Sequence, residues 1–150
     1  MIELLIVVAI IGVLAAVGIP MYNGYIATAK VNATKENHSR IRDMIAASFT
    51  KCASGSQYIV LKTNSSGGTS NMSCNSSASV FNSRFVNHFN YDGFKNPHKT
   101  SENCCYNSNS TRPQLGRTFL GVSGNRILVN TNVGTDSGGN AYLSASVTKE

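Results

Sequence analysis

The sequence contains no tryptophan, few acidic residues and no pattern of side chains that supports catalysis. Asp and Glu together number 7 among 150 residues, against 13 Lys and Arg and 3 His. The histidines show no spacing that pairs them with a nucleophile, and no glycine-rich phosphate loop follows a predicted strand. We therefore expect a protein that is not an enzyme and that binds no cofactor.

Runs of basic residues are also absent. The formal net charge is +6, but lysine and arginine are scattered singly between Lys30 and Lys149. A dispersed positive charge is more typical of a soluble surface than of a binding site. Attraction to phosphate alone would allow only weak, salt-sensitive binding to DNA or to an anionic surface.

Charge is missing altogether from residues 4–29, which form a long apolar run. At about 1.5 Å per helical residue, such a run can span a bilayer core of about 30 Å. A secretory signal begins with basic residues and has a small-residue cleavage site after a short apolar core, whereas this segment has no basic start and no obvious stop. A helical membrane anchor is the favoured interpretation, with an uncleaved signal anchor as the alternative.

Two residues do not fit a simple membrane span. Glu3 lies at the edge of the apolar run, where an unpaired carboxylate costs about 2 kcal/mol or more. Pro20 lies inside a segment that otherwise continues as helix, and an interior proline kinks the axis. The carboxylate therefore needs a partner, and the proline needs a compensating advantage.

Residues 2–20, with Glu3, Gly12 and Pro20 at the family's spacing, resemble the mature N-terminus of the bacterial type IV pilins. The resemblance implies that a prepilin peptidase removes a short basic leader and that the first mature residue is N-methylated. The family's glutamate lies four positions after that first residue, whereas Glu3 is the third residue of this sequence. We therefore expect two further mature residues before Met1, or a misassigned start.

The resemblance also implies a function and its partners. The chain would be a structural subunit that polymerises with copies of itself into an extracellular type IV pilus. Before assembly it would cross the inner membrane once and engage the pilus assembly machinery. Glu3, Gly12 and Pro20 would be the assembly residues, and Glu3 would pair with the N-terminal amine of a neighbouring subunit. Adhesion, twitching motility, aggregation and DNA uptake are the downstream roles that this family implies.

Two other functions compete with this interpretation. A major pseudopilin of a type II secretion system shares the N-terminal segment and often carries a calcium site in its C-terminal loops. Asp136, with Asn132 and Asn140 nearby, could imitate such a site, but a single carboxylate argues against tight calcium binding. A monomeric, membrane-anchored periplasmic binding domain would need a ligand pocket, which no sequence feature indicates.

Residues 1–26 are expected to form the membrane anchor and filament-core helix, and residues 27–150 the globular pilin domain. Apolar residues recur at helical spacing through residues 27–53 and again through 77–90, which predicts two amphipathic helices. Residues 58–61 read as a short strand, and polar residues 64–71 as a surface loop. Strands at residues 117–122 and 126–133, with a further segment at 141–147, predict an antiparallel sheet over about 116–147. The expected fold class is α+β, with a long N-terminal helix packed on this sheet, as in the type IV pilin fold.

Four cysteines, at positions 52, 74, 104 and 105, are an even number in a chain that we expect to be exported. They do not form the matched short-spaced pairs with nearby histidines that a zinc site needs, so we expect no metal there. Two disulfides are expected instead. A bond between the adjacent Cys104 and Cys105 would need a strained ring, so Cys52 and Cys74 are each expected to pair with one member of that doublet. The sequence does not decide which.

The last expectation concerns residues 12–20. Gly12 and Gly18 each lower helix propensity by about 1 kcal/mol relative to alanine, and Pro20 leaves the Ala16 carbonyl without its helical partner. In a bilayer every backbone group must be bonded internally, so the isolated subunit should stay mostly helical here, with a kink. In the assembled filament, the family resemblance implies an extended interruption of the helix between Gly12 and Pro20.

Overall fold

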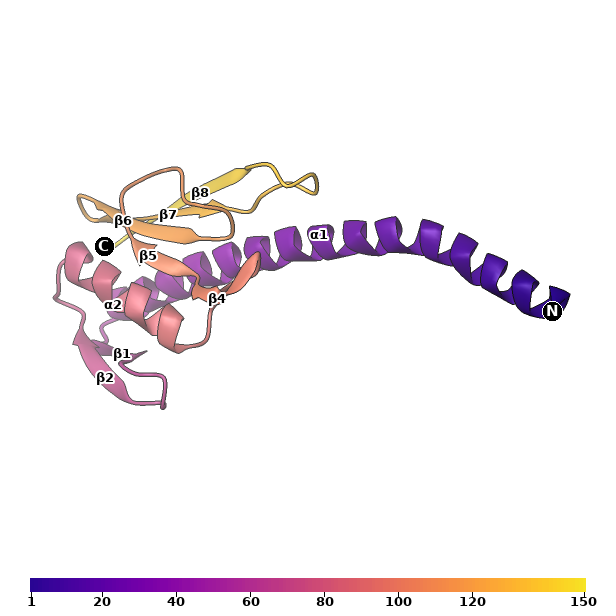
Figure 1. Cartoon of the computed structure of the whole chain (residues 1–150). Helices are drawn as coiled ribbons and strands as arrows, with labels where there is room; N and C mark the ends of the chain where they lie inside the picture. Colours follow the sequence, from indigo (N-terminus) through magenta and orange to yellow (C-terminus); the bar gives the residue numbers. More distant parts are fainter.

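Helix α1 is the longest element of the chain and spans Ile2–Ala53, a length of 52 residues. The computed structural model describes all of residues 1–150. The first part of α1 projects away from the rest of the molecule, and its C-terminal part lies against the other elements (Figure 1). The buried residues of α1 begin at Val31 and end at Phe49. The predicted end of this helix near Ala53 is confirmed.

Pro20 lies inside α1, and the helix continues through it. The axis of α1 curves along its projecting part and does not break (Figure 1). An interior proline removes one backbone hydrogen bond, so the Ala16 carbonyl has no helical partner. Despite this lost hydrogen bond, the single chain remains helical across residues 12–20, as expected for the unassembled form.

The sheet of the domain has four strands in the order β5-β6-β7-β8. Strands β6 (Thr118–Ser123), β7 (Arg126–Asn132) and β8 (Tyr142–Thr148) are antiparallel neighbours. They confirm the strands predicted at residues 117–122 and 126–133, and the segment at 141–147 is the edge strand β8. Strand β5 (Cys105–Asn107) pairs in parallel with β6, and the sequence does not predict it because its 3 residues carry no alternating apolar pattern. The α+β architecture expected from the sequence is thus present.

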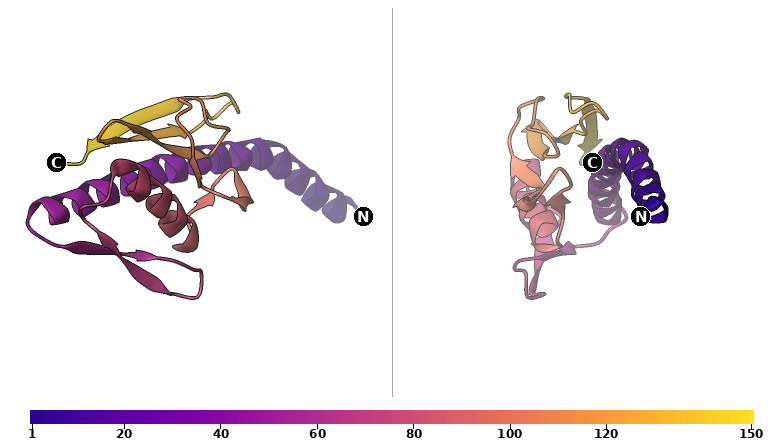
Figure 2. Two further views of the ribbon diagram at one scale, coloured as in Figure 1. Left: turned by 90° about the vertical axis from the view of Figure 1, so that its left-hand side faces the viewer. Right: turned by 45° about the vertical axis from the view of Figure 1, so that its right-hand side comes forward.

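Both helices cover one face of this sheet (Figure 2). Helix α2 spans Ala78–Tyr91, which confirms the predicted second helix, and the Oγ of Ser77 caps its start by accepting the Val80 amide. Phe49 of α1 packs edge-on against Phe81 of α2, with the ring centroids 5.3 Å apart. Edge-to-face packing is a favoured geometry for aromatic pairs, and this contact joins the two helices through the core. The sheet contributes Leu120, Ile127 and Val129 to the same core.

Two short antiparallel hairpins lie outside the main sheet. Strand β1 (Tyr58–Lys62) pairs with β2 (Thr69–Ser73), and β3 (Lys95–Asn96) pairs with β4 (Lys99–Asn103). The strand predicted at residues 58–61 is confirmed, but the loop predicted at 64–71 is wrong at its end, because β2 begins inside it. The reason is that Met72 is the only buried residue of β2, so this strand lacks the apolar alternation that would predict it.

All of the cysteines are bonded, as expected, but the predicted pairing is wrong. Cys52 bonds Cys74, with the Cα atoms 5.4 Å apart, and Cys104 bonds its neighbour Cys105. Cys74 precedes the start of α2, whereas the Cys105 carbonyl accepts a hydrogen bond of 2.8 Å from Asn90 near the end of α2. The length of α2 therefore separates Cys74 from the doublet by roughly 18 Å, which no disulfide can bridge.

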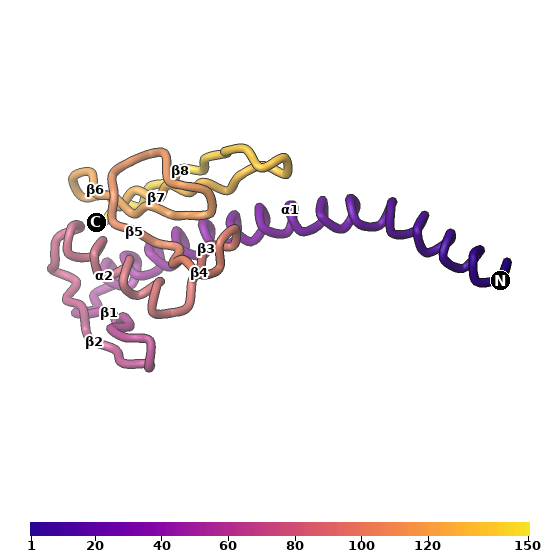
Figure 3. The backbone as a smooth tube through the Cα atoms, viewed as in Figure 1, coloured from indigo at the N-terminus to yellow at the C-terminus, as the bar shows by residue number.

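The connection between β5 and β6 passes over the sheet face that points away from the helices (Figure 3). The side-chain Nδ2 of Asn132 in β7 donates to the Pro113 carbonyl at 3.1 Å, and the Val122 backbone amide donates to the Asn109 Oδ1 at 2.7 Å. A side chain at Gly121 would collide with Asn109, so the close approach of this connection requires glycine. The outer face of β6 and β7 is therefore covered by polar contacts.

Candidate assembly surface

The projecting part of α1 exposes apolar side chains on every side. None of residues 2–26 is buried by the rest of the chain, and Leu14, for example, is 66% exposed. We refer to the side chains of residues 2–26 as the apolar surface. Monomeric soluble proteins rarely expose a contiguous apolar patch of this extent. The helix is long and apolar enough to span a membrane or to act as a signal anchor, so lipid or protein is needed to cover it.

The three predicted assembly residues lie along the apolar surface and do not form one cluster. Glu3 and Gly12 lie on opposite sides of the helix, about 13 Å apart along the axis, and Pro20 lies about 12 Å further on. Glu3 forms no ion pair within the chain. A side chain at Gly12 would meet nothing within 4 Å. Within the single chain, Glu3 therefore has no ion-pair partner, and no contact requires glycine at position 12.

A buried polar contact fixes α1 to the sheet. Nδ1 of His38 lies 2.8 Å from the Thr131 hydroxyl, which in turn lies 2.8 Å from the Thr118 hydroxyl. Burial lowers the pKa of His38 below 6.5, and the nearby Arg42 lowers it further. The neutral imidazole can therefore bond the hydroxyl without an uncompensated charge. Sequence reasoning missed this contact because His38 lies within an otherwise apolar helical stripe and its partners are far away in the sequence.

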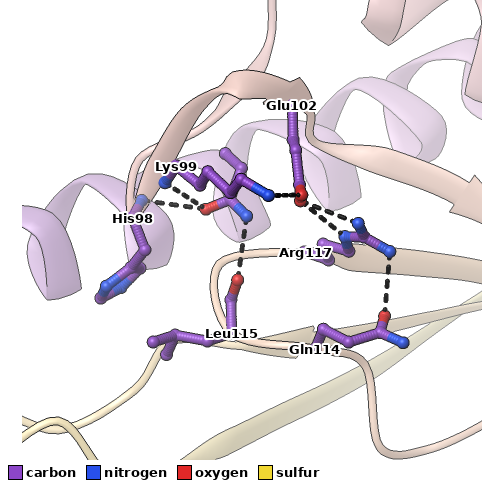
Figure 4. A network of polar contacts seen from close by, with 7 residues as sticks. His98, Lys99, Glu102, Gln114, Leu115 and Arg117 are labelled. Atoms are coloured by element: carbon purple, nitrogen blue, oxygen red, sulfur yellow. Dashed lines mark hydrogen bonds and ion pairs between the residues drawn. The ribbon is translucent and has the colours of Figure 1, made fainter.

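A second polar cluster joins β4 to the start of β6 (Figure 4). One carboxylate oxygen of Glu102 accepts from Lys99 at 2.6 Å, and the other accepts from Arg117 at 2.8 Å. The hydrogen bonds from Lys99 and Arg117 lower the pKa of Glu102 to about 2. The Arg117 guanidinium also stacks on Tyr106, 4.5 Å from the ring centroid. Both carboxylate oxygens of Glu102 are bonded to cations. The ion pair with Arg117 therefore holds β4 against the start of β6.

The loop of residues 132–141, which contains the possible calcium ligands, is held by hydrogen bonds among its own amide groups. The Oδ1 of Asn132 accepts the Gly134 amide at 3.1 Å and the Ala141 amide at 3.3 Å. The Nδ2 of Asn132 donates to the Asn140 side chain at 2.8 Å. The two amide oxygens that could join Asp136 around a cation are thus engaged in holding the loop. Nowhere in the chain do three His, Cys, Asp or Glu side chains form a group that could hold a metal ion.

A comparison of the chain with protein-family models, with curated proteins and with solved structures found no match. The architecture itself consists of a long N-terminal apolar helix, a small sheet domain and a disulfide between the end of that helix and the domain. This combination is compatible with a pilin fold.

Proposed function

We propose that the chain is the structural subunit of a type IV pilus and that its activity is self-association through the apolar surface. The observation that carries the proposal is the exposed apolar part of α1, which continues without a break into a helix packed on the domain. In the membrane this surface is covered by lipid. In a filament it is covered by the same surface of neighbouring subunits.

The energetic argument is that the apolar surface needs a cover that survives outside the membrane. Full burial of a Leu or Ile side chain stabilises by about 1.5–3 kcal/mol, and the projecting helix carries many such side chains. A subunit that leaves the bilayer alone would lose this stabilisation. A bundle of identical helices restores it, while the globular domains remain outside in water. Extracellular location on a surface pilus, after a stage in the inner membrane, is part of this proposal.

Glu3 and Gly12 support the same proposal. The Glu3 carboxylate has no ion pair in the chain, and a neighbour's N-terminal amine would supply one inside an apolar filament core. Gly12 lies on an open part of the helix, where a side chain would meet nothing in the single chain. A glycine at this position allows a neighbouring helix to approach closely.

Electron microscopy of filaments sheared from the surface of producing cells tests the proposal. We expect thin filaments whose tryptic peptides include those of residues 27–150. A pseudopilin would be recovered in the periplasm and inner membrane without surface filaments, and a monomeric binding domain would remain membrane-bound. Either of these results would contradict the proposed function.

A further inference from the structure

An open pocket of about 740 Å³ lies at the end of the domain remote from Met1. One of its walls is the outer face of the β1–β2 hairpin. Ile59 and Met72 of this hairpin face the core, so the alternate residues Tyr58, Asn71 and Ser73 face the pocket. The opposite wall comes from the turn after α1 and from the end of the chain. Figure 2 shows that the C-terminal ends of α1 and of the chain lie at this end of the molecule, away from the N-terminus.

The covalent structure holds the two walls in place. The disulfide between Cys52 and Cys74 joins the end of α1 to the residue that follows β2, and both cysteines line the pocket. The Cys74 amide donates to the Gln57 carbonyl at 2.9 Å. Gly55 makes the intervening turn with a φ of 99°, a conformation that favours glycine. The pocket therefore needs no ligand to form, which lowers the entropic cost of binding.

The Ser73 hydroxyl of this pocket accepts the Asn75 backbone amide, but the side-chain amides of the pocket are not used by the fold. Those of Gln57, Asn71 and Asn75 line it, and none of the hydrogen bonds within the chain involves them. Elsewhere in the domain, by contrast, asparagine amides hold loops together: those of Asn90, Asn96 and Asn132 each bond the backbone of another segment. The amides of the pocket are thus free to bond a ligand.

The lining also limits the chemistry of that ligand. Tyr58, a residue that is 47% exposed, contributes its aromatic ring, and the disulfide provides the remaining apolar contact. Lys149 and Glu150 are the charged residues of the lining, and their charges have opposite signs. A strongly charged ligand would meet no net opposite charge, and a lipid or other largely apolar ligand would meet too little apolar surface.

We propose that this pocket binds a neutral carbohydrate. Sugar hydroxyls both donate and accept hydrogen bonds, and each amide side chain offers both donors and an acceptor. The apolar C–H face of a pyranose ring can lie against the exposed Tyr58 ring. Tyrosine suits such a contact because its ring is apolar while its hydroxyl can remain in water. The proposal goes beyond filament formation and does not depend on it, because a single chain supplies both walls.

The test uses the full chain, labelled with nitrogen-15, in micelles of a zwitterionic detergent that carries no sugar. The probes are the methyl glycosides of glucose, galactose and N-acetylglucosamine, with sialyllactose and inorganic phosphate as charged comparisons. We expect at least one neutral glycoside to give saturable amide shifts centred on Gln57, Tyr58, Asn71 and Asn75. Shifts absent from these residues, or stronger binding of a charged probe, would overturn the proposal.

Variants sharpen the test. Tyr58→Ala should weaken binding of the responding glycoside about tenfold, and Tyr58→Phe should restore it, because the ring makes the contact. The matched controls are Tyr142→Ala, which removes another exposed tyrosine on β8, and Asn87→Ala, which removes an exposed amide on α2. Both controls should leave affinity within about twofold of the parent chain. Equal affinity in Tyr58→Ala, with an otherwise unchanged spectrum, would contradict the proposed site.

Discussion

At the scale of single residues, Glu3 and His38 mark the two kinds of environment along α1. Glu3 lies on the apolar surface without an ion pair, and His38 lies in the domain core with a hydroxyl partner. Each is a polar group that burial makes costly unless it is paired. His38 finds its partner inside the chain, whereas the partner that we propose for Glu3 belongs to another subunit.

Replacement of Glu3 by alanine should leave the chain in the membrane but abolish filaments or sharply reduce their yield. The reason is that the neighbour's N-terminal amine would then be buried without a counter-charge, which is strongly destabilising. Immunoblots of the membrane fraction and of sheared filaments measure the two outcomes.

The matched control for Glu3 is Glu36→Ala, because Glu36 is exposed on the domain part of α1 and forms no ion pair. This variant should assemble normally. A normal filament yield from Glu3→Ala would show that the carboxylate plays no part in assembly.

Acidification should destabilise the domain as the pH falls below about 6.5. Burial holds the pKa of His38 below its ordinary value of 6.5, and burial likewise lowers the pKa of His88, which is flanked by Asp92 and Lys62. The unfolded chain therefore binds protons that the folded chain does not, so the free energy of unfolding decreases as the pH falls through this range. Urea unfolding at about pH 7.5 and about pH 5 measures the difference.

A His38→Gln variant provides the comparison for this pH effect. Glutamine cannot take up a proton, so the variant should lose the share of the pH dependence that belongs to this position. A slope identical to that of the parent chain would mean that His38 is not protonated differently in the two states.

At the scale of elements, the helices were predictable, but the short strands β2, β3, β4 and β5 were not. Phe81, Phe85 and Phe89 recur at helical spacing, and this local pattern is sufficient to predict α2. Strands β2 and β5 depend on neighbours that no local pattern reveals, since β2 buries only Met72 and β5 pairs in parallel across a long connection. The disulfide pairing also depends on the placement of α2 between the cysteines, which is a property of the tertiary structure.

Removal of the Cys52–Cys74 bond should lower the free energy of unfolding by about 3 kcal/mol, because it closes a long loop in the unfolded chain. Removal of the Cys104–Cys105 bond should cost clearly less, since adjacent residues close almost no loop. Chemical denaturation of the two double Cys→Ala variants compares the losses. Mass spectrometry of a non-reduced digest checks the pairing, and a peptide that links Cys74 to Cys104 or Cys105 would disprove it.

Pro20→Ala should make the assembled filament stiffer. Gly12, Gly18 and Pro20 weaken one short part of α1, which we expect to become extended among other subunits. Alanine at position 20 restores a backbone hydrogen bond and favours continuous helix. Force–extension curves of single filaments should therefore show less extension under load.

Asn32→Ala is the control for that prediction, because Asn32 lies in the same helix outside both the weak segment and the apolar surface, and its side chain is exposed. It should leave the extension unchanged. Equal extension of the Pro20→Ala filament and the parent filament would argue that residues 12–20 do not change conformation.

At the scale of the whole molecule, the projecting helix and the domain lie at opposite ends (Figure 1), and their exposed side chains differ in chemistry. One end is an apolar helix that requires a cover, and the other is a hydrogen-bonding domain with a polar pocket. Sequence alone indicated the first end, because Glu3, Gly12 and Pro20 lie in one continuous segment. It did not indicate the pocket, whose lining comes from β1, β2, the turn after α1 and the end of the chain.

The most direct test of the central claim is a cryo-electron microscopy map of the filament formed by the chain. Self-association through the apolar surface predicts that residues 2–26 of every subunit pack against the same residues of its neighbours along the filament axis, with the domains on the outside. A filament held together by domain contacts, with residues 2–26 in lipid or detergent, would contradict the claim.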